Sequence, residues 1–141
     1  MQPPVITIYS VTVLLNADPD ALRRGYSAVD ALHYDSRTVL DLDESTPERA
    51  LSRAFEIGNR EGKDNLDRAW SPNVRSISVG DVIHVNYLHI TEGGVIKATG
   101  CEGYYSVDPI GFTLLDSDPM IAYGTQRMID AGVAHYAALA R

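Results

Sequence analysis

The chain has 141 residues, of which 45% are hydrophobic and 22% are charged, and its formal net charge is −7. This composition predicts one folded domain over residues 1–141, and the negative charge argues against general binding to nucleic acid or anionic membranes. Cys101 is the only cysteine, and no signal-type leader or membrane-length apolar run is found, so we expect a cytoplasmic protein without membrane association.

The N-terminal part is predicted to contain two strands separated by a short helix. Residues 5–15 are rich in β-branched side chains, which favour a strand. Asp18 and Pro19 are typical of an N-cap and a first helical residue, and we expect the helix to continue to Ala31. Residues 33–42 predict the second strand.

The clearest helix is predicted over residues 46–58. Ser45 followed by Glu48 fits a capping box, and an apolar stripe recurs at helical spacing behind it. Residues 60–73 are polar and predict a long loop that contains Trp70.

The second half predicts most of the sheet. We expect strands within residues 77–90 and 96–115, with a turn at 79–81, and a bulge or corner marked by Gly100 and Gly103. A further helix is predicted over residues 118–141, which either packs on the sheet or forms an interface with a partner or a second copy. The expected fold class is α+β, with a curved, largely antiparallel sheet covered by two or three helices, and with a barrel-like closure as an alternative.

The residues that could support catalysis form no recognisable motif. The four histidines and Cys101 lack the spacing of a metal site, and no nucleophile motif is present, so we predict no metal, no cofactor and no catalytic residues. Asp81 is expected to cap neighbouring amides. The alternative for it is a pocket shared with His84 and Tyr105, in a small enzyme that acts on a nucleotide-like ligand.

Residues 49–75 form a basic segment within the acidic chain, because they contain six basic and four acidic side chains. Phosphate contacts together with one stacking ring would suit RNA or single-stranded DNA. The ring, Trp70, has burial in the core as its favoured alternative. The candidate interaction residues of this segment are Arg49, Arg53, Arg60, Arg68, Trp70 and Arg75.

One stretch of sequence resembles a known family. The helix that ends at residues 55–59 (Phe-Glu-Ile-Gly-Asn), the segment 75–83 (Arg-Ser-Ile-Ser-Val-Gly-Asp-Val-Ile) and the segment 104–112, which ends in Gly-Phe, follow one another in order. They resemble the YodL-like and KfrB-like small domains of plasmids, integrative elements and phages. The resemblance covers about residues 46–114 and leaves 118–141 as a helical extension.

This resemblance implies an accessory module rather than an enzyme, and it carries over no catalytic residues. The Gly-Asp-Val turn is also similar to that of small β-barrel RNA-binding domains of the PUA and ASCH type. The hypothesis that we favour is a mobile-element protein that binds a protein partner and inhibits a host factor. Nucleic-acid binding and a small enzyme are the two alternatives.

Overall fold

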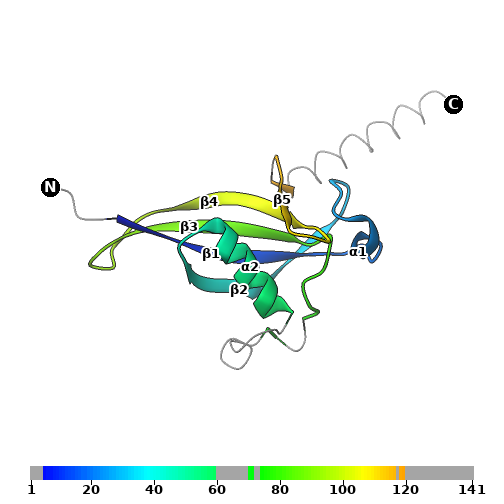
Figure 1. Ribbon diagram of the computed structural model, residues 1–141, viewed down its shortest axis with the longest axis horizontal. Coiled ribbons are helices and arrows are strands. Elements are labelled where there is room, and N and C mark those ends of the chain that lie inside the picture. Colours follow the sequence, from blue (N-terminus) through cyan, green and yellow to red (C-terminus); the bar gives the residue numbers. More distant parts are fainter. Residues whose placement is uncertain (1–4, 60–69, 72–73, 117, 120–141) are drawn as a thin grey trace, which may run out of the picture.

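The computed structural model describes residues 5–59, 70–71, 74–116 and 118–119. They form an α+β fold built on one five-stranded antiparallel sheet, with strand order β2-β1-β3-β4-β5 (Figure 1). The strands are β1 (Val5–Asn16), β2 (Leu32–Glu44), β3 (Val82–Thr91), β4 (Ile96–Val107) and β5 (Phe112–Leu114). The sheet is open, with β2 and β5 at its two edges, so the alternative of a closed barrel is wrong for this part of the chain.

The helix α2 (Pro47–Gly58) covers one face of the sheet by packing on β1, β2 and β3. Its predicted position is confirmed, but its N-cap is Thr46 rather than Ser45, because the Thr46 side chain accepts the Arg49 N–H at 3.2 Å. The main core lies between α2 and this face. Its buried members are Val11, Val13, Leu42, Ala50, Leu51, Ala54, Ile57, Trp70, Val74, Ile77, Ile83, Val85 and Val107.

A smaller core cluster lies on the opposite face of the sheet. Side chains alternate between the two faces along a strand, so Leu14 and Val82 point away from α2. They are buried together with Leu32, and Tyr104 and Leu115 pack against them. Val82 therefore belongs to a different cluster from Phe55, which packs on the main core.

Two element boundaries differ from the sequence predictions. The helix expected to reach Ala31 is a single turn, α1 (Ala21–Arg24), because Gly25 ends it at a φ of 88°. The strand expected from residue 77 begins at Val82, because Ile77 packs against α2 and donates its N–H to the Gly58 carbonyl.

Of the two glycines predicted to mark a bulge or corner in β4, Gly103 flanks a bulge, whereas Gly100 pairs in register with Tyr87. The register of β4 against β3 shifts between Cys101 and Gly103, which is a bulge at Glu102. The Tyr87 ring lies directly over Gly100, where an added Cβ would come within 2.5 Å of the Tyr87 hydroxyl oxygen. The predicted helix over 118–141, apart from its first two residues, and most of the loop over 60–73 lie outside the described residues.

Candidate functional site

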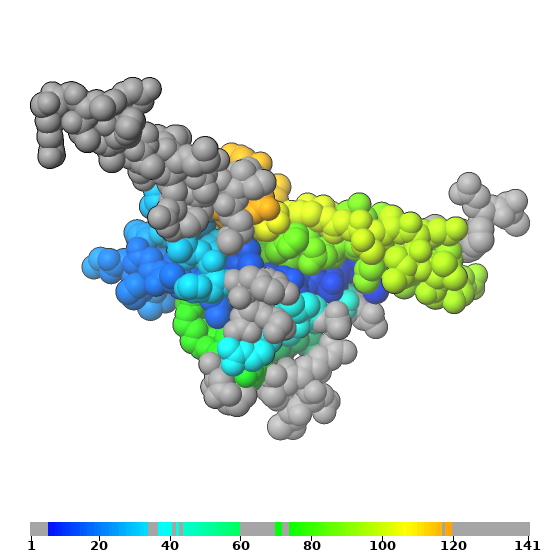
Figure 2. Space-filling view, turned by 180° about the vertical axis from the view of Figure 1, so that it is seen from behind, coloured from blue at the N-terminus to red at the C-terminus, as the bar shows by residue number. Residues whose placement is uncertain are grey.

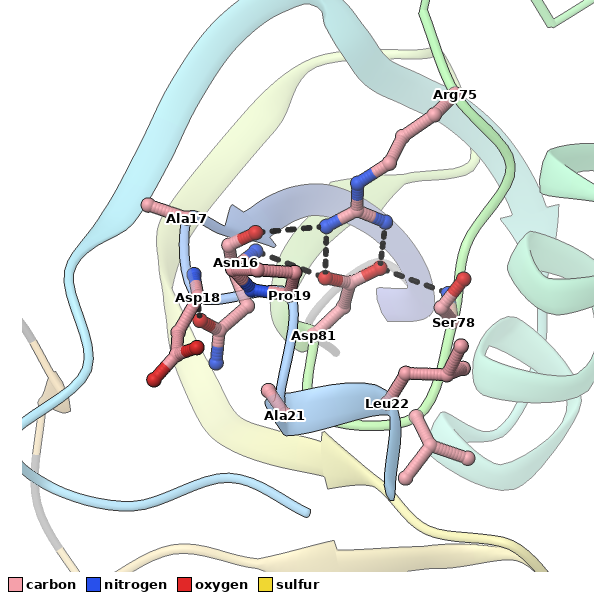
Figure 3. A pocket seen from close by; sticks show the side chains of 10 residues that line it. Asn16, Ala17, Asp18, Pro19, Ala21, Leu22, Arg75, Ser78 and Asp81 are labelled. Carbon is pink, nitrogen blue, oxygen red and sulfur yellow. Dashed lines mark hydrogen bonds and ion pairs between the residues drawn. The ribbon is translucent and has the colours of Figure 1, made fainter. Parts of the chain in front are cut away.

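The segment 75–83 builds a buried ion pair at one end of the sheet (Figure 3). Asp81 is 0% exposed, and its two carboxylate oxygens accept from the Arg75 guanidinium at 2.6 and 2.8 Å. The same oxygens also accept the backbone N–H groups of Asn16 and Ser78, each at 2.8 Å. Asp81 thus has the predicted capping role, and it joins the end of β1 to the turn before β3.

Asn16 connects this ion pair to a second one. Its side-chain NH2 donates to Asp30 and to the Gly80 carbonyl, both at 2.9 Å. Arg24 in turn donates to both oxygens of Asp30 and to Asp18. We call the residues Asn16, Asp18, Arg24, Asp30, Arg75 and Asp81 the polar clasp.

Electrostatics within the polar clasp favour the charged forms. Burial acts to raise the pKa of Asp30, but hydrogen bonds from Arg24, Asn16 and the Ser27 amide outweigh it and lower the pKa. The hydrogen bond to Asp81 is the main cause of a raised pKa for Arg75. The pKa shifts of Asp30 and Arg75 thus both favour the ionised forms that pair within the polar clasp.

A pocket of about 280 Å³ lies beside the polar clasp and is lined by Asn16, Ala17, Asp18, Pro19, Ala21, Leu22, Arg75, Ser78, Val79 and Asp81 (Figure 3). Both oxygens of Asp81 already accept two hydrogen bonds each. Arg75 likewise uses both terminal nitrogens on Asp81, Ser76 and Asn16. The hydrogen bonds of Asp81 and Arg75 therefore hold three chain segments together.

The structure does not bring Asp81, His84 and Tyr105 together. Tyr105 packs on the main core, on the face that α2 covers, whereas His84 pairs across the strands with Tyr104 and points to the opposite face. The carboxylate of Asp81 is held in the polar clasp. The pocket that the small-enzyme alternative requires is therefore not formed.

His84 belongs instead to an aromatic cluster on the face opposite α2. Its ring stacks on Tyr104 with centroids 4.2 Å apart, and the Tyr104 hydroxyl donates to Asp118 at 3.1 Å. Burial lowers the pKa of His84, while burial and the bond to Asp118 raise the pKa of Tyr104 to about 12. His84 Nε2 is buried and has no hydrogen-bond partner within the described part of the chain.

The structure separates the residues predicted for nucleic-acid contacts. Trp70 is 2% exposed, lies in the main core and donates its indole N–H to the Arg75 carbonyl at 2.7 Å, so its ring is not accessible for stacking on a base. Arg53 pairs with Glu56, and Arg75 belongs to the polar clasp. Arg49 is exposed on α2. Arg60 and Arg68 lie outside the described residues.

The sequence did not reveal an apolar surface at the far end of the sheet. The β3–β4 hairpin and the first half of β1 extend beyond α2 (Figure 1). At this end, Ile90 of β3 lies between Ile6 of β1 on one side and Ile96 of β4 on the other. Two residues further along the strands, on the same face, Ile8 of β1 lies opposite Leu88 of β3. These five side chains share the face that points away from α2, and we call them the ladder face.

The ladder face is accessible within the described chain. Ile6 is 51% exposed and Ile96 60% exposed, and Ile8, Leu88 and Ile90 are half-buried. Seen from behind, this end of the molecule is an arm formed by the strands, with β4 along its length (Figure 2). The register of the strands and the side of the sheet that α2 covers decide this surface, and neither was predicted.

Among the described residues, no helix is long and apolar enough to cross a membrane, and no three potential ligands gather into a metal site. In comparisons with known proteins, no family model matches this chain, and neither the curated proteins nor the solved structures contain a significant match. The resemblance to the YodL-like and KfrB-like domains therefore stays a prediction.

Proposed function

We propose that this protein is a small accessory module that acts by binding a protein partner through the ladder face. The observation that carries this proposal is the direct cross-strand register of Ile6, Ile90 and Ile96. The most extensive apolar patch on the surface of a soluble protein is often a site of protein interaction. The ladder face is continuous over three strands, whereas most other exposed aliphatic side chains of the described residues, such as Val29, stand apart from it.

A polar hollow borders the ladder face and supports the same proposal. It has a volume of about 320 Å³ and is lined by Ser10, Asn86, Tyr87, Leu88, Thr99 and Gly100. Ser10, Asn86 and Thr99 face the same side as the ladder and carry hydroxyl or amide groups. An apolar centre with adjacent hydrogen-bonding groups is the usual composition of a protein–protein interface.

The free edge of β4 is a less suitable binding surface. Beyond its pairing with β5, β4 presents residues 96–103 as an edge that no other described strand pairs with. The register of β4 against β3 shifts at Lys97 and at Glu102. Each shift is a bulge, and each bulge contains a charged residue. Bulges and charges are the features by which proteins prevent strand addition at an edge, so we assign binding to the face.

The biological setting that we propose rests on the resemblance. A YodL-like or KfrB-like module would be an accessory protein of a phage or plasmid, and binding through an apolar face would suit inhibition of a host factor. The acidic chain would favour a basic partner surface around the apolar contact.

The experiment that tests this proposal is capture of partners by the tagged full chain from host lysate, with and without nuclease treatment. The variant carries Ile6→Lys and Ile96→Lys. Its matched control carries Leu22→Lys and Val29→Lys, because these aliphatic side chains are similarly exposed, at 63% and 56%, away from the ladder face.

We expect the native chain to capture one protein with and without nuclease treatment. The control variant should still capture this protein, and the ladder variant should not. Each buried aliphatic side chain contributes about 1.5–3 kcal/mol, so the affinity should fall at least about tenfold. Equal retention by both variants would refute the ladder face as the site. Recovery that depends on intact nucleic acid would favour the nucleic-acid alternative.

A further inference from the structure

The short strand β5 lies at the edge of the described sheet, beside β4 (Figure 1). At one end of β5 the Asp108 N–H donates to the Gly111 carbonyl at 3.0 Å. At the other end the Leu115 N–H donates to the Tyr104 carbonyl at 2.8 Å. In an antiparallel pair, every second pair of opposite residues exchanges hydrogen bonds, so these two contacts define which positions of β5 bond to β4.

Phe112 and Leu114 occupy the positions between the bonded ones, because the register of β4 and β5 is continuous. In such positions the backbone N–H and C=O groups point away from the neighbouring strand. The groups of Phe112 and Leu114 therefore point to the outer side of β5, where no other described strand pairs with them.

The strand β5 lacks the bulges and charges of the other sheet edges. The edge of β4 contains two charged bulges, and the register of β2 against β1 shifts at two places. By contrast, β5 has the uncharged sequence Phe-Thr-Leu and pairs with β4 without a shift. A regular, uncharged edge can accept an added strand, and three residues limit the pairing to a short segment.

An apolar groove lies next to this edge, on the face that α2 partly covers. The helix packs on β1, β2 and β3, and Leu114 of β5 is 59% exposed. A pocket of about 220 Å³ lies between Ser52 and Phe55 of α2 and the turn that joins β4 to β5. The Phe112 ring borders it and meets the Phe55 ring edge to face at 6.3 Å. Small-molecule sites usually measure about 300–1,000 Å³, so this pocket suits a single side chain.

The charges around the edge indicate the kind of partner. Residues 98–119 contain four acidic side chains and no basic one; the acids are Glu102, Asp108, Asp116 and Asp118. The neighbouring α2 contains two acidic and two basic side chains, so it does not offset them. A second copy would bring the same acids to the edge and be repelled, whereas a basic segment would be attracted.

We infer that the outer edge of β5 binds an extended, basic segment of a partner protein by strand addition. Main-chain hydrogen bonds to Phe112 and Leu114 would hold the segment, and one of its apolar side chains would fill the pocket beside Phe55. We call the edge and this pocket the β5 groove. It lies on the α2 face and at the opposite end of β4 from the ladder face, so it does not depend on the proposed function.

The probe that tests this inference is a random peptide library displayed on phage and selected on the full chain. We expect selected peptides in which Lys or Arg flanks apolar residues at alternate positions. The affinity of the synthetic peptide should fall as salt rises from about 0.05 M to about 0.5 M, because exposed charges are screened. Failure to select such peptides, or an affinity that does not depend on salt, would overturn the inference.

N-methylation of the selected peptide, one amide at a time, tests strand addition on the native protein. A strand at the edge donates every second N–H to its neighbour. Methylation should therefore abolish binding at every second amide and be tolerated at the amides between. A scan without this alternation would contradict strand addition.

Variants of the chain test the location. Leu114→Pro removes the outward N–H, and proline is tolerated at a strand edge, so peptide affinity should fall at least about tenfold. Leu114→Val keeps this N–H and should bind like the native chain. Asp116→Lys should weaken binding more than Glu92→Lys, which makes the same charge change at the β3–β4 turn. Native affinity in Leu114→Pro, or equal effects of the two lysines, would place the peptide elsewhere.

Two further measurements separate the alternatives. Circular dichroism checks that Leu114→Pro is folded, and if it is not, the N-methyl scan still decides the inference. The ladder variant should bind the peptide with nearly native affinity, and loss of binding there would contradict the β5 groove as the site. In sedimentation, a dimer of the native chain that Leu114→Pro abolishes would show that a second copy occupies the edge, which would refute the basic segment.

Discussion

Substitution of Asp81 by asparagine should destabilise the protein by far more than its single-atom change in size suggests. One carboxylate oxygen accepts from Asn16 N–H and Arg75, and the other accepts from Ser78 N–H and Arg75. Whichever way the asparagine side chain turns, its NH2 replaces one of these acceptors. One backbone N–H and one guanidinium N–H then face a donor.

The magnitude follows from these two lost bonds. A buried backbone N–H without a partner costs about 1–3 kcal/mol, and a hydrogen bond to a charged group contributes about 1.5–3 kcal/mol. Their sum agrees with the about 3–5 kcal/mol lost when one partner of a buried ion pair is removed. The Arg75 side chain is 44% exposed and can turn to water, so we expect the lower end of that range, about 3 kcal/mol.

Urea unfolding measures this loss, with fluorescence of the buried Trp70 and circular dichroism as independent probes. The matched control is Asp20→Asn, because Asp20 pairs with Arg23 at the surface, where both side chains are largely exposed. That pair should contribute less than about 0.5 kcal/mol. A loss below about 1 kcal/mol for Asp81→Asn would refute the view that the polar clasp stabilises this end of the sheet.

Three further predictions concern other features of the fold. Gly80 has a φ of 93°, and an added Cβ would lie 2.5 Å from the Ala21 Cβ, so Gly80→Ala should lower the free energy of unfolding in urea by about 3 kcal/mol. Gly94 has a φ of 83° but lies in open space, so Gly94→Ala should lower it by only about 1 kcal/mol. Equal losses for the two variants would contradict the clash with Ala21. Folding lowers the pKa of Asp30, so the stability that Asp30 contributes is present above the pKa of the unfolded state and is lost as the pH falls through the pKa of the folded state. The free energy of unfolding should therefore decline below about pH 5, and Asp30→Asn should make that decline less steep. Partial burial of the thiol group, together with Asp118 and Glu102, raises the pKa of Cys101, so its alkylation by iodoacetamide at pH 8 should be slower than that of a short cysteine peptide, and faster reaction would contradict this environment.

Local sequence patterns predicted the elements whose causes are local. The β-branched run of residues 5–15 and the capped, amphipathic pattern of 46–58 each determine one element, and both are present as expected. The turn of Gly80 and Asp81 is equally local, because the Arg75 partner of Asp81 is only six residues away.

Features that depend on distant contacts were missed. Ile77 resembles a strand residue in sequence, but its packing against Gly58 of α2 keeps it out of β3. Asn16 bonds to Asp81, which is 65 residues away, and nothing near Asn16 indicates this. Both the polar clasp and the ladder face depend on which strands are neighbours, and a single sequence does not show that order.

The distribution of ionisable and apolar groups in the described chain supports the proposed binding role. An active site usually holds perturbed acids and bases in a cleft where a substrate can reach them. Here the paired charges of the polar clasp bond to one another and to backbone groups, so they fix the fold. Burial lowers the pKa of His84 and raises that of Tyr104, the two rings stack on each other, and the His84 Nε2 atom is buried. The exposed, continuous surface is aliphatic instead, and burial of aliphatic surface is the main driving force of protein association. Charges that stabilise one end of the sheet, and apolar side chains that are exposed at the other, therefore support the proposed binding of a protein partner through the ladder face.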